Sequence, residues 1–423
     1  MNKFHFSLLF TTLVSLVFSH ELNEDTAFLL TCPISTAKDL DFLHSLAAAG
    51  HPIDIFQEKV LLGTEGSVVQ LLTDELTSEI LLSRANCFEE KGRSSVKRLF
   101  SASAASPAKI GLEFHDDYRS YDNILDQLDF YAKTYPEVVK LLKSVGKSHE
   151  GRDLPVIHIT AAKNKLGTKP LIWIMAGQHA REWIATSSAM LFIENILHNH
   201  ELLDEYEFAV MPLVNPDGYE YSRSRNRMWR KNRRSPNGVD LNRNWDHRWC
   251  EIGKPNLFNN NFHVFIGSSR EEYTDDYCGP SAASEPEIHS TQKYILSLPN
   301  RAIGFDVHSY SQLILRNYGW TRRPSPHERV LSAISKRMAD SMKSLYNVKY
   351  TPMLSAGLYP SSGSAEDWLY VKAGIPGFVM ELRDKGQYGF HLPRSQIKPT
   401  GMELYIGIIT AIASHNITEF IPS

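Results

Sequence analysis

Residues 169–185, which read KPLIWIMAGQHAREWIA, decide how the rest of the chain is interpreted. Residues 171–175 form a continuously apolar run, which predicts a strand that is buried on both faces of a sheet. A break containing glycine follows, and the apolar periodicity over residues 183–198 predicts a helix. His179 and Glu182 therefore lie at a strand-to-helix junction, where open α/β sheets place their ligand sites.

The spacing of these two residues suits a metal ion. A separation of three places the side chains of His179 and Glu182 on one face of the first helical turn. Zinc accepts imidazole nitrogen and carboxylate oxygen, and a catalytic zinc needs one more protein ligand and an open position for water. With 17 His in the chain, about one His-x-x-Glu is expected by accident, so the pair needs support elsewhere.

Composition and the first residues indicate the class of protein. A length of 423 residues allows two or three domains, and a net charge of -3 gives no argument for a nucleic-acid partner. Lys3 precedes an apolar run over residues 6–18, which is too short for a membrane anchor and is typical of a signal peptide. We expect residues 1–19 to be removed, and the mature protein to be secreted without a membrane anchor.

The alternation of segments predicts two domains. Residues 20–98 should form a small α+β (βαββαβ) domain and a linker, with strands at 27–32, 53–57, 60–63 and 78–83 and helices at 36–49 and 67–76. The linker, residues 89–108, is rich in Ser, Ala and basic residues. It is interpreted either as a flexible connection or as a joint cut by a protease near Lys97 and Arg98.

Residues 99–423 are predicted to form one large α/β domain. The alternating pattern favours a mixed, mainly parallel sheet with helices on both faces. Its predicted strands are 154–161, 171–175, 207–214, 302–308 and 377–382, and its predicted helices are 120–145, 183–198, 326–346 and 394–414. The irregular stretch 217–283 is long for a compact domain, and such loops usually build sites.

Two residues at the ends of predicted strands are candidates for the same chemistry. His308 ends an apolar strand and is the candidate third zinc ligand, because the preceding ligand pair outweighs the structural role that a lone His usually has. Glu381 lies near the end of the strand in GFVMELRD, and a buried carboxylate needs a partner or a task. Beside a zinc-bound water it would be the general base; the alternative is a salt bridge to Arg383.

An arginine-rich segment lies in the long irregular stretch. Seven arginines crowd into residues 223–243, and such a run is ordinarily a solvated basic face. The segment is interleaved with Asn and Trp side chains, and the chain is otherwise slightly acidic. Guanidinium and Asn groups together favour binding of a carboxylate and stabilisation of an oxyanion.

Taken together, these motifs closely resemble the zinc carboxypeptidases of the pancreatic A/B type, the M14 family, and the resemblance runs from the leading domain to about residue 414. It implies a secreted, zymogen-type enzyme that removes the C-terminal residue of peptide or protein substrates with a free C-terminus. It also implies an inhibitory pro-domain that an activating endoprotease removes. One zinc ion per chain would be bound by His179, Glu182 and His308.

The resemblance implies roles around the reacting bond. Glu381 would activate the zinc-bound water, Arg230 would polarise the scissile carbonyl, and Asp240 would orient His179.

It also implies how the substrate is held. Asn242 and Arg243 would bind the C-terminal carboxylate, and Tyr359 would cap it. Further residues lining the cleft would be Arg181, Arg227, Tyr310 and Phe390.

Specificity is expected to depend on Glu366. In the family, the position seven residues after the capping tyrosine lies at the floor of the specificity pocket, and counting from Tyr359 gives Glu366. A carboxylate there argues for C-terminal Lys or Arg. The alternative is a carboxylate that turns to solvent or pairs with Arg316, which would leave an apolar pocket and a preference for apolar residues. The residues of that apolar pocket would be Leu315, Gly319 and Val379.

The chain departs from the family pattern at two places. Arg316 and Asn317 stand where the family usually has Tyr-Pro, and Pro236 stands where the pancreatic enzymes have a cysteine.

Two expectations concern the cysteines. Cys250 and Cys278 should pair, because both lie in one loop of a secreted protein. Cys32 and Cys87 should not pair, because the first and last strands of a βαββαβ domain would put them on opposite edges.

Two other functions compete with this hypothesis. A non-catalytic peptide-binding protein on the same fold would tolerate loss of Glu381, which is present. A zinc amidohydrolase acting on small acylated amino acids is disfavoured by the leading domain and by the carboxylate-binding pair with Tyr359.

Overall fold

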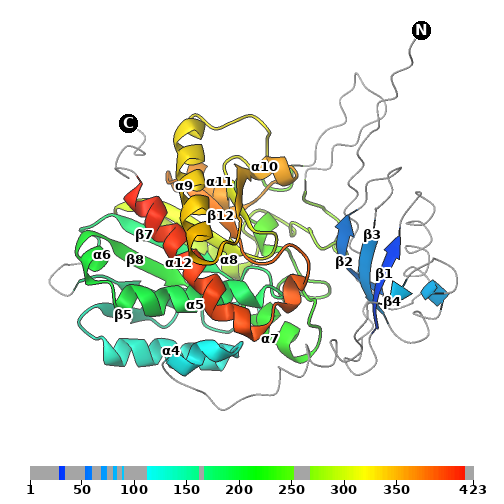
Figure 1. Ribbon diagram of the computed structural model, residues 1–423, viewed down its shortest axis with the longest axis horizontal. Helices are drawn as coiled ribbons and strands as arrows, with labels where there is room; N and C mark the ends of the chain where they lie inside the picture. Colours follow the sequence, from blue (N-terminus) through cyan, green and yellow to red (C-terminus); the bar gives the residue numbers. More distant parts are fainter. Residues whose placement is uncertain are drawn as a thin grey trace, which may run out of the picture. The chain divides into compact units, whose positions relative to one another are not determined.

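The computed structural model describes residues 28–33, 53–59, 68–73, 80–82, 88–89, 112–161, 166–251 and 267–414. The chain divides into two compact units, each built on its own sheet. The larger unit carries the predicted α/β domain, and Figure 1 shows its helices lying against a central sheet.

The sheet of the larger unit has eight strands in the order β11-β10-β12-β9-β7-β8-β6-β5. Its centre, from β12 to β8, is parallel, whereas the pairs β5–β6, β6–β8 and β10–β12 are antiparallel. The predicted mixed, mainly parallel sheet is therefore confirmed. The strands are β5 (Val139–Leu142), β6 (Val156–Ile159), β7 (Leu171–Ala176), β8 (Glu207–Met211), β9 (Arg301–His308), β10 (Leu313–Arg316), β11 (Thr351–Leu354) and β12 (Gly377–Glu381).

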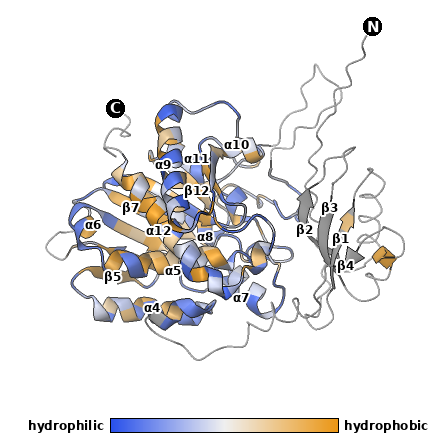
Figure 2. Cartoon of the chain, viewed as in Figure 1, coloured by the Kyte–Doolittle hydropathy of each residue, from blue (hydrophilic) through white to orange (hydrophobic). Residues whose placement is uncertain are grey.

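Helices cover both faces of this sheet because both faces are apolar. Ile172 and Ile174 of β7 pack in a core with α4, α5, α9 and α12, and Trp173 and Met175 pack on the opposite face with α8 and α11. In Figure 2, β7 is accordingly coloured as hydrophobic. The helices are α4 (Tyr121–Thr134), α5 (Trp183–Leu197), α6 (His200–Glu205), α7 (Pro216–Ser224), α8 (Pro286–Ser297), α9 (Glu328–Tyr346), α10 (Ser355–Leu358), α11 (Ala365–Val371) and α12 (Ile397–Ala413).

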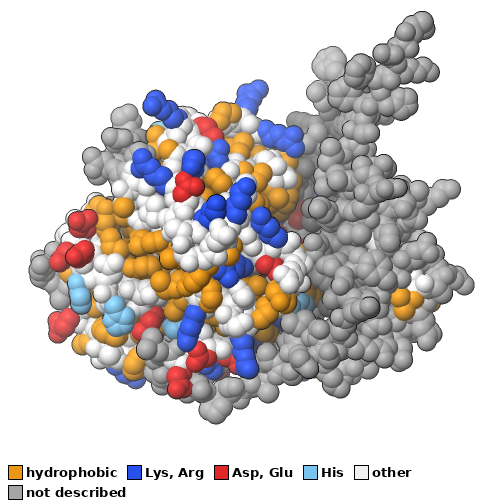
Figure 3. Space-filling model, in the orientation of Figure 1, with side chains coloured by type: hydrophobic (Ala, Val, Ile, Leu, Met, Phe, Trp, Pro, Cys, Tyr) orange, Lys and Arg blue, Asp and Glu red, His pale blue; other side chains and the backbone are white. Residues whose placement is uncertain are grey.

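The outer side of the helical layer carries both charged and apolar side chains. On the face seen in Figure 3, Lys, Arg, Asp and Glu side chains are scattered around a broad band of hydrophobic ones. Short 3₁₀ helices complete the unit at η2 (Leu112–Asp116), η3 (Leu241–Arg243), η4 (Gly389–His391) and η5 (Arg394–Gln396). None of the helices in the described ranges is long and apolar enough to cross a membrane.

Some predicted boundaries in the larger unit are wrong. The helix predicted over 120–145 ends at Thr134, because Pro136 disfavours helical conformation in the residue before it. Strand β5 follows directly and pairs with β6. Strands β10 and β11 were not predicted; each has four residues, too few to show an alternation.

The smaller unit contains a four-stranded antiparallel sheet in the order β2-β3-β1-β4. Its strands are β1 (Phe28–Pro33), β2 (Ile53–Lys59), β3 (Val68–Thr73) and β4 (Phe88–Glu89). The predicted helix over 67–76 is wrong, since β3 begins with two β-branched residues and pairs with both β1 and β2. The predicted strand over 78–83 is wrong as well, because residues 80–82 are helical. The signal peptide, the helix over 36–49, the strand over 60–63 and the linker from residue 90 lie outside the described residues.

The disulfide prediction for the larger unit is confirmed, and the one for the smaller unit is wrong. Cys250 and Cys278 form a disulfide with Cα atoms 5.8 Å apart. Cys32 is also disulfide-bonded. The error arose from the strand assignment: the last strand begins at Phe88 and pairs with Thr31, next to Cys32. Cys87 itself lies outside the described residues.

Candidate metal centre and substrate cleft

The loop between β7 and α5 brings His179 and Glu182 to the carboxyl end of the sheet. Gly177 allows this turn: its φ is +69°, and an added Cβ would lie 2.7 Å from a methyl carbon of Leu213. Strand β9 runs parallel to β7 and ends at His308. Because parallel neighbours end at the same edge of a sheet, the three predicted ligands meet although they are far apart in sequence.

The three side chains converge on one point and are buried. Glu182 Oε1 lies 2.9 Å from His179 Nδ1, and Glu182 Oε2 lies 2.9 Å from His308 Nδ1. The two Nδ1 atoms face each other at 3.0 Å, an approach that suits a cation shared between their lone pairs. Two imidazole nitrogens and a carboxylate, with all donor atoms within 4.8 Å of one another, fit the donor set of a catalytic zinc.

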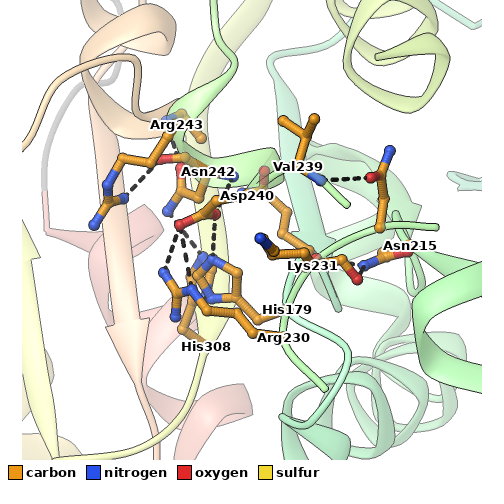
Figure 4. Close-up of polar contacts among 12 residues, drawn as sticks. His179, Asn215, Arg230, Lys231, Val239, Asp240, Asn242, Arg243 and His308 are labelled. Atoms are coloured by element: carbon orange, nitrogen blue, oxygen red, sulfur yellow. Dashed lines mark hydrogen bonds and ion pairs between the residues drawn. The ribbon is translucent and has the colours of Figure 1, made fainter. Parts of the chain in front are cut away.

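Each histidine of the cluster is held from behind by a carboxylate. Asp240 Oδ1 lies 2.9 Å from His179 Nε2, and Asp306 Oδ2 lies 2.8 Å from His308 Nε2. These bonds leave both Nδ1 atoms facing the centre. Asp240 lies where the sequence predicted it, beside His179 (Figure 4). Asp306 was missed, although an acid two residues before a strand-end histidine was a usable signal.

The cluster and its supporting acids are strongly coupled electrostatically. Burial raises the pKa of Glu182, but its contacts with His179 and His308 outweigh burial and hold the pKa well below its usual range. Burial likewise raises the pKa of Asp240, and the charge of Arg230 with the hydrogen bond to His179 holds that pKa well below its usual range. Both carboxylates are therefore kept ionised as acceptors or ligands.

Arg230 lies at the edge of the cluster. Its Nη2 donates to Asp240 Oδ2 at 2.8 Å, and its Nη1 lies 4.0 Å from Glu182 Oε1. Asn215, which the sequence analysis missed, fixes this segment: its side chain donates to the carbonyls of Gln178 and Lys231, each at 3.0 Å (Figure 4). The guanidinium is thereby placed next to the candidate metal centre.

Asn242, Arg243 and Tyr359 lie together, as predicted. Asn242 Nδ2 is 3.3 Å from His308 Nε2, and its Oδ1 accepts a hydrogen bond from the amide of Ala365 at 2.9 Å. Arg243 donates to the carbonyl of Asn242 at 2.7 Å and to the Tyr359 hydroxyl at 3.1 Å. A guanidinium, an amide and a phenol therefore line one side of the cluster, which is a suitable set for a carboxylate.

The other predicted cleft residues form an aromatic group and a separate arginine. The guanidinium of Arg181 lies 4.5 Å from the ring centre of Phe390, and Phe390 packs edge-on against Tyr310 at 4.9 Å. Burial raises the pKa of Tyr310 to about 12, so the phenol is neutral at physiological pH. Arg227 is buried in the turn that follows α7.

Glu381 ends β12 directly opposite His308 on β9. Its removal from water raises the pKa of Glu381 to about 8. The alternative of a salt bridge to Arg383 is wrong: Arg383 instead forms a buried ion pair with Glu403 of α12, at 2.8 Å between Nε and Oε2. The carboxylate of Glu381 is thus left for the site.

Glu366 is buried in the first turn of α11. Its Oε1 accepts a hydrogen bond from Ser355 Oγ at 2.8 Å, and its Oε2 has no hydrogen-bond partner among the described residues. Arg316 pairs with Glu328, at 2.5 Å between Nη2 and Oε1. Neither form of the alternative therefore holds, since Glu366 faces away from solvent and is not paired with Arg316.

Comparisons with known proteins agree with this geometry. Residues 124–407 match the family model described as zinc carboxypeptidase, Peptidase_M14. Carboxypeptidase A1 of Bos taurus is 30% identical over 400 residues, which cover 90% of this chain and 88% of that protein. Carboxypeptidase B of Canis lupus familiaris is 33% identical over 308 residues, 70% of each. The crystal structure of thrombin activatable fibrinolysis inhibitor superposes with a TM-score of 0.78 at 27% identity, covering 93% of this chain and 99% of that one.

Proposed function

The chain belongs to the zinc carboxypeptidase family and is a metallocarboxypeptidase, and from this premise we propose how its residues bind and cut a substrate. One zinc ion binds to His179, Glu182 and His308, and Glu381 is the general base. One observation carries the proposal: two histidines and a carboxylate converge at the ends of adjacent parallel strands, with Glu381 opposite one of them.

The chemistry divides between the metal and the chain. Zinc bound at this cluster supplies a Lewis acid that lowers the pKa of water. Glu381 would take the proton from the attacking water and return it to the leaving amine, a role that its position opposite His308 allows. Asp240 keeps His179 in the orientation that presents Nδ1 to the centre.

Three groups bind the end of the substrate, and one polarises the bond to be cut. Arg230 donates to the oxygen that becomes negative in the transition state. Asn242 and Arg243 bind the terminal carboxylate, and the hydroxyl of Tyr359, already bonded to Arg243, closes over it. A peptide whose carboxylate is held there has its last peptide bond beside Glu381, which accounts for removal of one residue at a time.

C-terminal Arg and Lys are the preferred residues. Support comes from Glu366, a buried carboxylate with one oxygen that no described residue satisfies. Burying an ionised carboxylate costs free energy unless a cation, here that of the substrate side chain, pairs with it. We expect peptides ending in Arg or Lys to be hydrolysed roughly 30- to several-thousand-fold more efficiently than matched peptides ending in Phe or Leu. If Phe or Leu is released faster, and Glu366→Ile leaves that order unchanged, Glu366 is not the pocket floor.

Secretion and activation complete the proposal. The chain is made with a signal peptide over residues 1–19 and an inhibitory pro-domain over residues 20–98, which an endoprotease separates from the catalytic domain, residues 99–423. The apolar run at the start and the Ser-, Ala- and basic-rich linker support this.

The experiment for the proposed activity is C-terminal release from several peptides, followed by mass spectrometry. A chelator should abolish release from the protease-treated protein, and added zinc should restore it. A non-catalytic peptide-binding protein would bind these peptides without shortening them. Full release in the presence of a chelator would contradict the zinc mechanism.

A further inference from the structure

Two neighbouring rows of side chains lie on the same face of the sheet. In the first row, which belongs to the metal centre, His308 of β9 stands opposite Glu381 of β12. Two residues earlier, Asp306 stands opposite Val379, which in turn stands opposite Leu315 of β10. Residues two apart in a strand point to the same face. The Asp306 row therefore lies next to the row of the metal centre, on its side toward the amino end of β9.

Glu366 belongs to the same side of the sheet. Helix α11, which carries it, packs on β12 and β9. An added Cβ at Gly377, the first residue of β12, would lie 2.6 Å from the carbonyl oxygen of Glu366, and one at Gly319 would lie 2.7 Å from Glu366 Oε1. Glycine at these two positions therefore lets the helix approach and leaves the carboxylate room.

Asp306 uses only one of its two oxygens. Oδ2 lies 2.8 Å from His308 Nε2 and accepts a hydrogen bond from Gln178 Nε2 at 2.7 Å. Oδ1 is buried and has no hydrogen-bond partner in the part of the chain that the structure describes. Supporting a histidine requires one carboxylate oxygen, so this role leaves Oδ1 unexplained.

Two other buried oxygens in this region are also without donors. They are Glu366 Oε2 and the side-chain oxygen of Asn317, whose amide nitrogen donates to the Glu366 carbonyl at 2.8 Å. Burial and, to a smaller extent, the charge of Asp306 raise the pKa of Glu366, so the two carboxylates are within electrostatic reach of each other. Three buried acceptors without a donor describe a site for a ligand that brings several N–H groups.

We propose that Asp306 is a second specificity-determining residue, and that Asp306 and Glu366 together accept the guanidinium of a C-terminal arginine. This inference rests on the proposed preference for basic residues and makes it narrower. A guanidinium has five donors in a planar fork and can serve several acceptors at once, whereas an ammonium is a compact point charge. The pocket therefore favours Arg over Lys. Its second carboxylate, that of Asp306, is hydrogen-bonded to the candidate zinc ligand His308.

The first test separates specificity from support of His308. Asp306→Asn keeps an oxygen for His308 but loses the charge. We expect its kcat/KM to fall at least about tenfold more for a peptide ending in Arg than for the same peptide ending in Phe. The matched control is Asp240→Asn, the equivalent change behind His179, which should lower both values by the same factor. Equal losses for Arg and Phe in Asp306→Asn would overturn the inference.

The second test compares Arg with Lys in the wild-type protein and adds a binding measurement that does not depend on turnover. Wild-type protein should hydrolyse a peptide ending in Arg at least about tenfold more efficiently than the one ending in Lys, and a preference for Lys would overturn the inference. Calorimetry with L-arginine and its neutral isostere L-citrulline gives a binding readout. Wild type should bind arginine more tightly, and Asp306→Asn and Asp306→Ser should reduce this ratio at least about tenfold.

The outcomes distinguish this inference from the proposal on which it rests. If wild type hydrolyses Phe peptides faster than Arg peptides and binds citrulline as well as arginine, the basic preference itself is wrong. If Glu366→Gln loses the Arg preference while Asp306→Asn retains it, the basic preference stands and the role of Asp306 is wrong.

Discussion

Glu381 is the residue on which the reaction most depends, and it can be tested alone. Glu381→Gln keeps the shape of the side chain and the zinc ligands but removes the base. Turnover should fall by at least about 10²- to 10⁴-fold, while the zinc content measured by atomic absorption stays at one ion per chain. Glu328→Gln is a matched control, because Glu328 lies on α9, pairs with Arg316 and has no role in the proposed reaction, so turnover should be unchanged. Near wild-type turnover in zinc-loaded Glu381→Gln would show that another group is the base.

Glu287 should make the stability of the enzyme depend on pH. It is buried on α8, where its Oε1 accepts a hydrogen bond from the amide of His149 at 2.9 Å, and burial raises its pKa to about 7 from 4.5. The folded state keeps this proton at a pH where the unfolded state has lost it. The resulting stabilisation is complete below pH 4.5 and is lost as the pH rises to about 7, on the order of 3 kcal/mol in all.

Urea unfolding of wild type and Glu287→Gln between pH 4.5 and 8 measures this effect. The free energy of unfolding of wild type should decline with pH relative to that of the variant. Parallel curves would mean that Glu287 does not titrate in this range.

At the scale of single residues, the sequence predicted what was local. The spacing of His179 and Glu182 is visible in the sequence, because three residues of helix bring both side chains to one face. Asp306 is the exception: it lies two residues before His308 on the same strand, so its side chain shares the face of His308, and this local signal was missed. The alternative that paired Glu381 with Arg383 was wrong, since Glu403 arrives from a helix that only the tertiary fold brings near Arg383.

The disulfide between Cys250 and Cys278 joins segments that support the site. Next to it, the carbonyl of Tyr277 accepts a hydrogen bond from the amide of Asp240 at 2.9 Å, and the carbonyl of Cys278 accepts one from Trp249 Nε1 at 2.8 Å. The double change Cys250→Ser with Cys278→Ser should lower the free energy of unfolding by about 2–4 kcal/mol, measured in urea without reductant. Unchanged stability would mean that the surrounding hydrogen bonds hold the loop without the covalent link.

At the scale of helices and strands, long apolar segments were predictable and short ones were not. β7 and β9 were found because a central strand covered on both faces must be apolar along its length. Strands β10 and β11 escaped because four residues carry no clear period. The segment Val68–Thr73 was mistaken for a helix, since VVQLLT is apolar at positions compatible with either period, and its pairing with β1 and β2 decides the outcome.

For the molecule as a whole, activation should require one cut. Cleavage near Lys97 and Arg98, or in the linker up to about Lys109, should release a stable fragment of roughly 35 kDa and switch activity on. Gel electrophoresis and peptide hydrolysis, followed in parallel during limited trypsin treatment, measure both events. Full activity of the purified, uncleaved chain would count against an inhibitory pro-domain.

The last helix, α12, also affects how readily other copies of the enzyme could remove residues from this chain. Every molecule of a carboxypeptidase meets neighbours that attack chain ends, and attack needs an extended end. Ala411 and Ile412 are buried in the last turn of α12, and the carbonyl of Ser414 accepts a hydrogen bond from Arg337 at 3.0 Å. Shortening beyond Ser414 would require this turn to be pulled out of the core first. We therefore expect α12 to resist shortening by the enzyme itself, because the packing that completes the fold keeps this turn from becoming an extended end.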